Sequence, residues 1–188
     1  MQIDLKPSDI TLLFAELQPQ VLRGDKTVGE GELARAVATV VDIARKLEIP
    51  IVSSTVRLGP PEAPVEMIEA VRAYPPVVRN SVGLLDDEAI AEPLERSGRR
   101  IVAIGGVSSE IAILHSVLGA CRRGYQVYVL TDCCSGLSQR SEAAAFRQME
   151  IAGAHMSNLS SFFTALVPHL DHPAANVVFE SLGRYWHW

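Results

Sequence analysis

The sequence predicts a single α/β domain of three layers, in which helices cover both faces of a mostly parallel sheet of six strands. Two observations carry this prediction. Short runs rich in β-branched residues alternate along the chain with segments whose apolar residues repeat at helical spacing. These runs are nearly continuous in apolar residues, which is typical of strands buried on both faces. With 188 residues, 48% of them hydrophobic, the chain has enough apolar material for a full core.

The elements can be assigned in order along the chain. The expected strands are residues 10–15, 49–56, 76–78, 100–105, 125–130 and 155–157. Helical patterns cover residues 33–47, 110–123, 138–152 and 159–166. Ser138 is expected to cap its helix and Gly124 to end the preceding one, because these residue types favour those positions. The Gly- and Pro-rich segment 58–64 is expected to be a loop.

Charge and composition exclude several classes of function. The 17 basic and 22 acidic residues give a net charge of -5, opposite to the excess expected for nucleic-acid binding. No apolar run reaches the roughly 18–20 residues of a membrane span, and the first residues lack the features of a secretory signal. Neither the three cysteines nor the five histidines show metal-ligand spacing. We therefore expect a cytoplasmic protein without nucleic-acid or membrane partners, bound metal or cofactor.

The end of the chain differs from the rest. Residues 1–168 contain the alternation of strands and helices and are expected to form the domain. Residues 169–188 are expected to form a C-terminal aromatic tail, which ends in Tyr-Trp-His-Trp at 185–188. Such an apolar end is unfavourable in water, so it is expected to pack on the domain or on a neighbouring subunit of a homo-oligomer.

Ligands of open parallel sheets bind at the carboxyl ends of the strands, so the residues that follow the predicted strands are the first candidates for a site. Glu16 follows the first strand and Arg79 the third, and we expect them within ion-pair distance. They form either an acid–base group with a shifted pKa or a structural ion pair. With Arg79 free of substrate, its charge is expected to outweigh burial and keep Glu16 ionised. Residues 105–110 form either an anion-binding turn or an ordinary capped turn.

Two adjacent cysteines are expected at the same edge of the sheet. Cys133 and Cys134 come shortly after the fifth predicted strand. A thiol there can act as a nucleophile if a neighbouring group lowers its pKa. The alternative, which we adopt, is that both are small side chains packed beneath a helix.

A set of motifs occurs in order along residues 8–168. It comprises Glu16-Leu17-Gln18 and Val77-Val78-Arg79 after strands, the Gly-Gly-Val-Ser-Ser-Glu turn at 105–110, Gly-Tyr-Gln-Val at 124–127, and the stretch 138–158. Together they resemble the isochorismatase-like superfamily, also called cysteine hydrolases, and within it the YcaC-like branch. The resemblance implies a parallel sheet in Rossmann-like order, an oligomer, and a cis peptide bond between Val107 and Ser108.

The resemblance also implies where the site lies. The family's typical set is Asp-Lys-Cys, whose cysteine attacks an amide-like carbon, and the three positions here hold Glu16, Arg79 and Ala112. Arginine cannot lose its proton, and alanine offers no nucleophile. The pocket is expected to be floored by Ala112. The expected substrate-binding residues are Gln18, Leu84, Val107, Ser108, Ile111 and His115.

Three functions are compatible with these residues. Our hypothesis is a hydrolase or related enzyme that acts on a small acidic molecule without a cysteine. Glu16 would be its general acid and Arg79 would bind the substrate. The resemblance implies that true isochorismatases also lack the cysteine and use the carboxylate at this position as a general acid. The second function is a catalytically inactive homologue that binds a ligand or partner. The third is a thiol hydrolase of C–N bonds whose nucleophile was replaced at Ala112.

Overall fold

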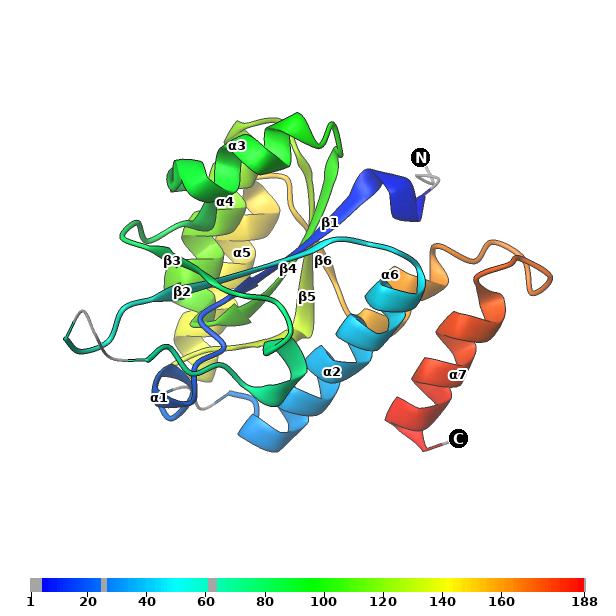
Figure 1. Cartoon of the computed structure of the whole chain (residues 1–188), viewed down its shortest axis with the longest axis horizontal. Helices are drawn as coiled ribbons and strands as arrows, with labels where there is room; N and C mark the ends of the chain where they lie inside the picture. Colours follow the sequence, from blue (N-terminus) through cyan, green and yellow to red (C-terminus); the bar gives the residue numbers. More distant parts are fainter. Residues whose placement is uncertain (1–4, 25–26, 61–63, 188) are drawn as a thin grey trace.

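The computed structural model describes residues 5–24, 27–60 and 64–187. Six parallel strands form one sheet in the order β3-β2-β1-β4-β5-β6 (Figure 1). The strands are β1 (Ile10–Ala15), β2 (Ile51–Val56), β3 (Val77–Arg79), β4 (Ile101–Val107), β5 (Gln126–Ser135) and β6 (His155–Ser157). The predicted fold class is confirmed. Of the predicted loop 58–64, residues 61–63 lie outside the described part of the chain.

Helices cover both faces of this sheet. One face carries α2 (Glu30–Lys46), α6 (Leu159–Thr164) and α7 (Ala175–Trp186), and the other carries α3 (Glu88–Arg96), α4 (Leu114–Arg122) and α5 (Gln139–Ile151) (Figure 1). Leu12 and Phe14 of β1 belong to the first core, whereas Leu13 and Ala15 belong to the second. Successive residues of a strand point to opposite faces, so a strand covered on both sides has to be apolar throughout.

Short helical elements occupy several of the connections. They are η1 (Pro7–Asp9), α1 (Pro19–Leu22), η2 (Glu69–Val71), η3 (Leu84–Asp86) and the π-helical turn η4 (Ser109–Ile113). The chain runs from β1 to β2 and β3 on one side and then crosses to β4 on the other side. The order in which the strands are added to the sheet therefore reverses between β1 and β4. The residues that follow these two strands lie close together at the carboxyl edge of the sheet.

Two elements differ from the sequence-based prediction. Residues 132–135 were expected after the fifth strand but form the end of β5. The pairing of β5 with β4 shifts between Ile104 and Gly106, and this irregularity lets β5 continue beyond the apolar run. Helix α3 was not expected, because its sequence is polar and contains Pro93. Asp87 caps it by accepting a hydrogen bond from the Ala89 N–H at 3.0 Å.

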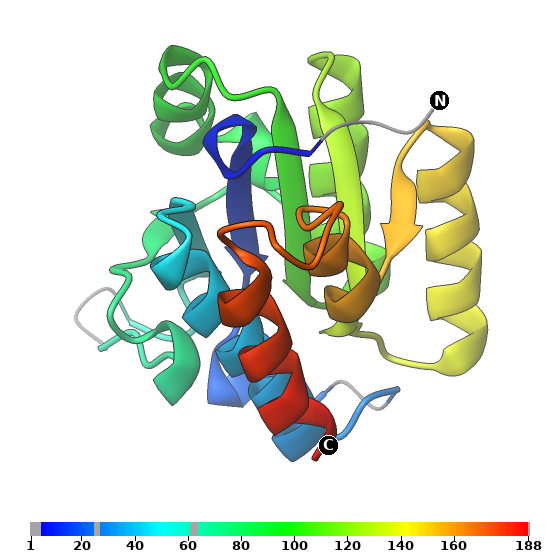
Figure 2. The same ribbon diagram turned by 90° about the vertical axis from the view of Figure 1, so that its right-hand side faces the viewer.

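The C-terminal tail is a helix that packs on its own domain. Figure 2 shows α7 lying along α2, and the two helices are in direct contact. Tyr185 is buried between them, whereas half of Trp186 is exposed and its Nε1 donates to Ser160 Oγ at 2.8 Å. The described part of the tail thus packs on the domain, and a contact with a neighbouring subunit stays a prediction. Within the described residues, no helix is both long and apolar enough to cross a lipid bilayer.

Candidate active site

Glu16 is held at the carboxyl edge of the sheet by its backbone. It follows β1 directly with a φ of 55°, and its N–H donates to the Ser54 carbonyl at 2.9 Å. On its other side β4 comes very close to β1, because a Cβ atom on Gly106 would lie only 2.2 Å from the Ala15 carbonyl oxygen. Only glycine permits this approach, which brings the end of β4 beside Glu16.

Arg79, the last residue of β3, forms the predicted ion pair with Glu16. Its Nη2 contacts Glu16 Oε1, its Nη1 donates to the Ser81 carbonyl, and its Nε is 3.5 Å from Ser54 Oγ. The Arg79 side chain is 0% exposed and that of Glu16 is 13% exposed. Since protein groups surround the guanidinium, it is not the free anion-binding group that the sequence-based hypothesis required. Its contact holds one oxygen of the Glu16 carboxyl group.

The protonation preference of Glu16 also differs from the expectation. Burial raises the pKa of the Glu16 carboxyl above its usual value, and the opposing effect of the Arg79 charge and hydrogen bond is smaller. The prediction that Coulomb attraction outweighs burial is therefore wrong. The structure favours the protonated acid at a higher pH than for an exposed glutamate.

Gln18 lies next to this pair and is almost fully buried. Its Nε2 donates to the Val56 carbonyl at 3.0 Å, whereas its buried Oε1 has no hydrogen-bond partner within the described residues. An unsatisfied buried acceptor is unfavourable unless a donor reaches it. Gln18 therefore leaves an unsatisfied buried acceptor beside Glu16.

The turn after β4 places Ala112 beneath the carboxyl edge of the sheet. The peptide bond between Val107 and Ser108 is cis, both residues are buried, and η4 begins directly after them. Ala112 is 0% exposed. Its carbonyl accepts from Ser116 Oγ at 2.5 Å, and the same hydroxyl accepts from the Leu84 N–H at 2.9 Å. Ser116 thus joins the segment after β3 to the turn that carries Ala112.

The remaining residues predicted to bind substrate differ in their exposure. Leu84 is fully buried in the second core, whereas Ile111 and His115 are exposed. Ile111 lies in the predicted helix 110–123, and 46% of it is accessible. The start of that helix is the π-helical turn η4 and not a regular α-helix.

Sequence reasoning missed the carboxylates that hold this turn in place. Glu110 Oε1 accepts from the Leu137 N–H at 3.0 Å and from Ser141 Oγ, and Ser109 Oγ donates to Glu142 Oε1 at 2.7 Å. These bonds tie η4 to the start of α5. Glu142 lies 33 residues from Ser109 in sequence, so no local pattern reveals the contact. An acidic residue in the first helical turn is the only signal present.

The adjacent cysteines are part of the core. Cys133 and Cys134 are fully buried in β5, and burial raises the pKa of both thiols. Cys121 is partly buried, and its pKa is also raised by burial. None of these environments favours the nucleophilic thiolate, which confirms the packing interpretation.

We expect slow thiol chemistry in the native protein. At pH 8, DTNB should label Cys133 and Cys134 at least about a hundredfold more slowly than glutathione, because both are inaccessible and protonated. In denaturant all three cysteines should react. The native reaction is followed at 412 nm and the labelled position mapped by mass spectrometry. Fast labelling of Cys133 or Cys134 would contradict this.

Two cavities lie away from the candidate site. One of about 560 Å³ lies between α2 and α7, and one of about 300 Å³ lies beside β2, lined mainly by apolar residues and Pro75. Neither is lined by Glu16, Arg79 or Ala112. Within the described residues, no group of three or more His, Cys, Asp and Glu side chains is arranged to hold a metal ion.

Comparisons with known proteins agree with this architecture. Residues 11–161 match the family model "Isochorismatase domain". The human protein "Isochorismatase domain-containing protein 2" is 29% identical over 145 residues, which cover 76% of this chain and 68% of the human one. The solved structure of YcaC from Pseudomonas aeruginosa has a TM-score of 0.85 at 23% identity and covers 100% of this chain and 96% of its own. Escherichia coli YcaC, described as an octameric hydrolase of unknown specificity, has a TM-score of 0.84 at 19% identity, covering 98% and 94%.

Proposed function

Because this chain belongs to the isochorismatase domain family, we propose that it is a hydrolase or related enzyme that acts on a small molecule through Glu16, without a cysteine. The observation that carries the proposal is the state of the Glu16 carboxyl group. One oxygen contacts Arg79, the other has no hydrogen-bond partner within the described residues, and the side chain is partly exposed. A held carboxyl group with one free oxygen can transfer a proton to a bound molecule.

The raised pKa favours the role of general acid. A carboxyl group that stays protonated at higher pH can protonate a leaving group, as catalytic carboxyls in apolar surroundings do. Arg79 supports this role by holding Oε1 in place. The charge of the substrate is a separate matter: an acidic group needs a partner other than Arg79, because the Arg79 side chain is 0% exposed. We propose the turn at Ser108, which keeps a small exposed fraction, as a contact for the substrate.

A second candidate is a catalytically inactive homologue that binds a ligand or partner. The observation that favours it is the complete burial of Ala112. A methyl group at the position of the family's nucleophile fills space and supplies no chemistry, and its burial leaves a substrate no direct access to it. In this case the Glu16–Arg79 pair is structural.

Replacement of Ala112 by cysteine separates these candidates. Wild type and Ala112→Cys are incubated with a panel of small amides, carbamates and vinyl ethers, and the products are identified by mass spectrometry. We expect the wild type to convert at least one compound, with a rate within about threefold of the variant's, because proton transfer needs no thiol. Ala120→Cys is the matched control, since it adds a thiol at another buried position of the same core.

The other outcomes identify the alternatives. Turnover that appears only in Ala112→Cys assigns the chain as a disabled thiol hydrolase. Binding of panel compounds without turnover in either protein assigns it as an inactive binding protein. Both results contradict the proposed acid–base route.

We propose in addition that the chain forms a homo-oligomer in the cytoplasm. The octameric E. coli protein of similar fold supports assembly. So do the exposed apolar residues Leu170, Phe179 and Trp186 in and before α7, which another subunit can cover. Light scattering tests the assembly, and a stable monomer at micromolar concentration would contradict it.

A further inference from the structure

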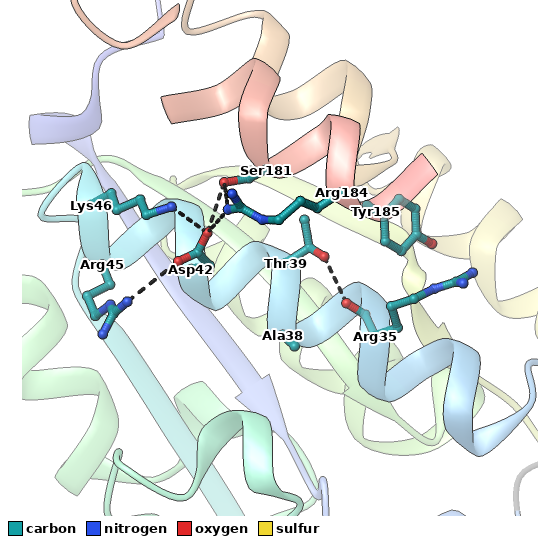
Figure 3. A pocket seen from close by; sticks show the side chains of 9 residues that line it. All are labelled: Arg35, Ala38, Thr39, Asp42, Arg45, Lys46, Ser181, Arg184 and Tyr185. Atoms are coloured by element: carbon teal, nitrogen blue, oxygen red, sulfur yellow. Dashed lines mark hydrogen bonds and ion pairs between the residues drawn. The ribbon is translucent and has the colours of Figure 1, made fainter. Parts of the chain in front are cut away.

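The larger cavity described above is a groove between α2 and α7 that the proposed reaction does not use (Figure 3). Its volume of about 560 Å³ is within the range typical of small-molecule sites. None of its lining residues belongs to the candidate active site. Whatever binds here is therefore independent of Glu16.

The groove concentrates positive charge on a protein that is acidic overall. Arg35, Arg45 and Lys46 of α2 and Arg184 of α7 line it, and Asp42 is the one acidic residue among its lining side chains. The whole chain carries a net charge of -5. A local excess of cations against this background creates a positive potential that attracts anions.

The single carboxylate is shared among three cations. Asp42 Oδ2 is 2.8 Å from Lys46 Nζ and 2.8 Å from Arg184 Nη2, and Asp42 Oδ1 is 3.5 Å from Arg45 Nη2. Asp42 Oδ2 also accepts from Ser181 Oγ at 2.9 Å. One negative charge cannot neutralise three positive ones, so the cluster keeps an excess of positive charge that can attract a further anion.

The arginines are held in place but keep donors free. Arg184 contacts Asp42 and Ser181 through Nη2, and no contact of its Nη1 or Nε is found within the described residues. The Arg35 guanidinium lies 5.1 Å from the centre of the Tyr185 ring, and no hydrogen bond from its N–H groups is found in the described part of the chain. Planar guanidinium groups with free N–H donors bind phosphate oxygens in pairs.

We propose that this groove binds the phosphate group of a phosphorylated small molecule. Three features favour a multiply charged anion: the excess of cations, the free guanidinium donors and the size of the groove. A second copy of the chain is a poor occupant of the groove itself, because a two-fold contact there would place the same cations against each other. The exposed apolar residues proposed for assembly, Leu170, Phe179 and Trp186, do not line the groove. A phosphate group carried by a lipid would show the same chemistry, so the experiment has to distinguish the two sources.

The test measures binding of inorganic pyrophosphate by calorimetry at low salt. We expect saturable binding of one pyrophosphate per chain. Lys46→Gln and Arg184→Gln should each weaken it about tenfold, because each removes a charge-assisted hydrogen bond. Asp42→Asn should tighten it several-fold, since it removes the carboxylate that competes for the same cations. A purely structural ion network predicts no gain from Asp42→Asn.

The control is Arg96→Gln on α3. It removes one exposed positive charge that pairs with Glu92 at 3.0 Å and lies outside the groove. Equal weakening by Arg96→Gln, or no saturable binding in either the wild type or Asp42→Asn, overturns the proposal. Phosphatidylcholine vesicles with and without phosphatidic acid form the second arm. Sedimentation with the acidic vesicles, in the absence of pyrophosphate binding, overturns the assignment to a small molecule.

Discussion

Replacement of Glu16 by glutamine is expected to lower turnover of any productive substrate at least about a hundredfold, while ligand affinity changes by less than about threefold. Glutamine keeps the size of the side chain but cannot donate a proton as an acid, and general acid–base catalysis contributes about 10²–10⁴ to rate. The measurement is kcat and KM of the wild type and of Glu16→Gln, with a substrate found in the panel of amides, carbamates and vinyl ethers. A loss in kcat without a rise in KM identifies a role in the chemical step.

The pH dependence gives a second readout of the same role. A general acid acts in its protonated form, so activity should be high at low pH and fall as the pH rises through the pKa of Glu16. Because burial raises that pKa, this fall should occur at a higher pH than for an exposed glutamate. Glu92→Gln is the matched control, since Glu92 is an exposed carboxylate on α3. Turnover that survives Glu16→Gln, with an unchanged pH profile, shows that Glu16 is not the acid.

Replacement of Arg79 by methionine is expected to lower the free energy of unfolding by about 3–5 kcal/mol at pH 8, because removal of one partner leaves the other charge buried and unpaired. Glu16 and the Ser81 carbonyl would each lose a donor. Chemical denaturation followed by circular dichroism measures the change. Arg72→Met is the control, because Arg72 forms an exposed pair with Glu69 and its loss should cost less than about 1 kcal/mol.

The cost of Arg79→Met should also depend on pH. Without the arginine, the folded-state pKa of Glu16 rises further above its unfolded value. A group of this kind supports the folded state at low pH and ceases to do so as the pH rises through its folded pKa. The variant should therefore lose less stability at about pH 4.5, close to the ordinary glutamate pKa, than at pH 8. A loss of equal size at both pH values would show that the buried charge of Glu16 is not the cause.

The order of strands and helices could be predicted from the sequence because it depends on local periodicity. The runs at 10–15 and 155–157 form β1 and β6 with the predicted bounds, and Ser138 caps α5 through a hydrogen bond from the Ser141 N–H. The rule that parallel strands end at one edge also brought Glu16 and Arg79 together correctly. Each of these features is determined by residues close in sequence or by a general rule of topology.

Other features depend on contacts between distant segments, so only the tertiary structure decided them. The extension of β5 through residues 132–135 accompanies a shift in its pairing with β4, and residues 109–113 form a π-helical turn at the start of the predicted helix. The burial that raises the pKa of Glu16 and surrounds Arg79 with protein acceptors comes from packing between strands. The cationic groove exists because α7 lies against α2, where Ser181 contacts Asp42 from 139 residues away in the sequence. The periodicity of a sequence predicts the secondary structure of each segment. The burial of a side chain, the charge around it and its unpaired hydrogen-bond donors depend on the distant segments that pack against it.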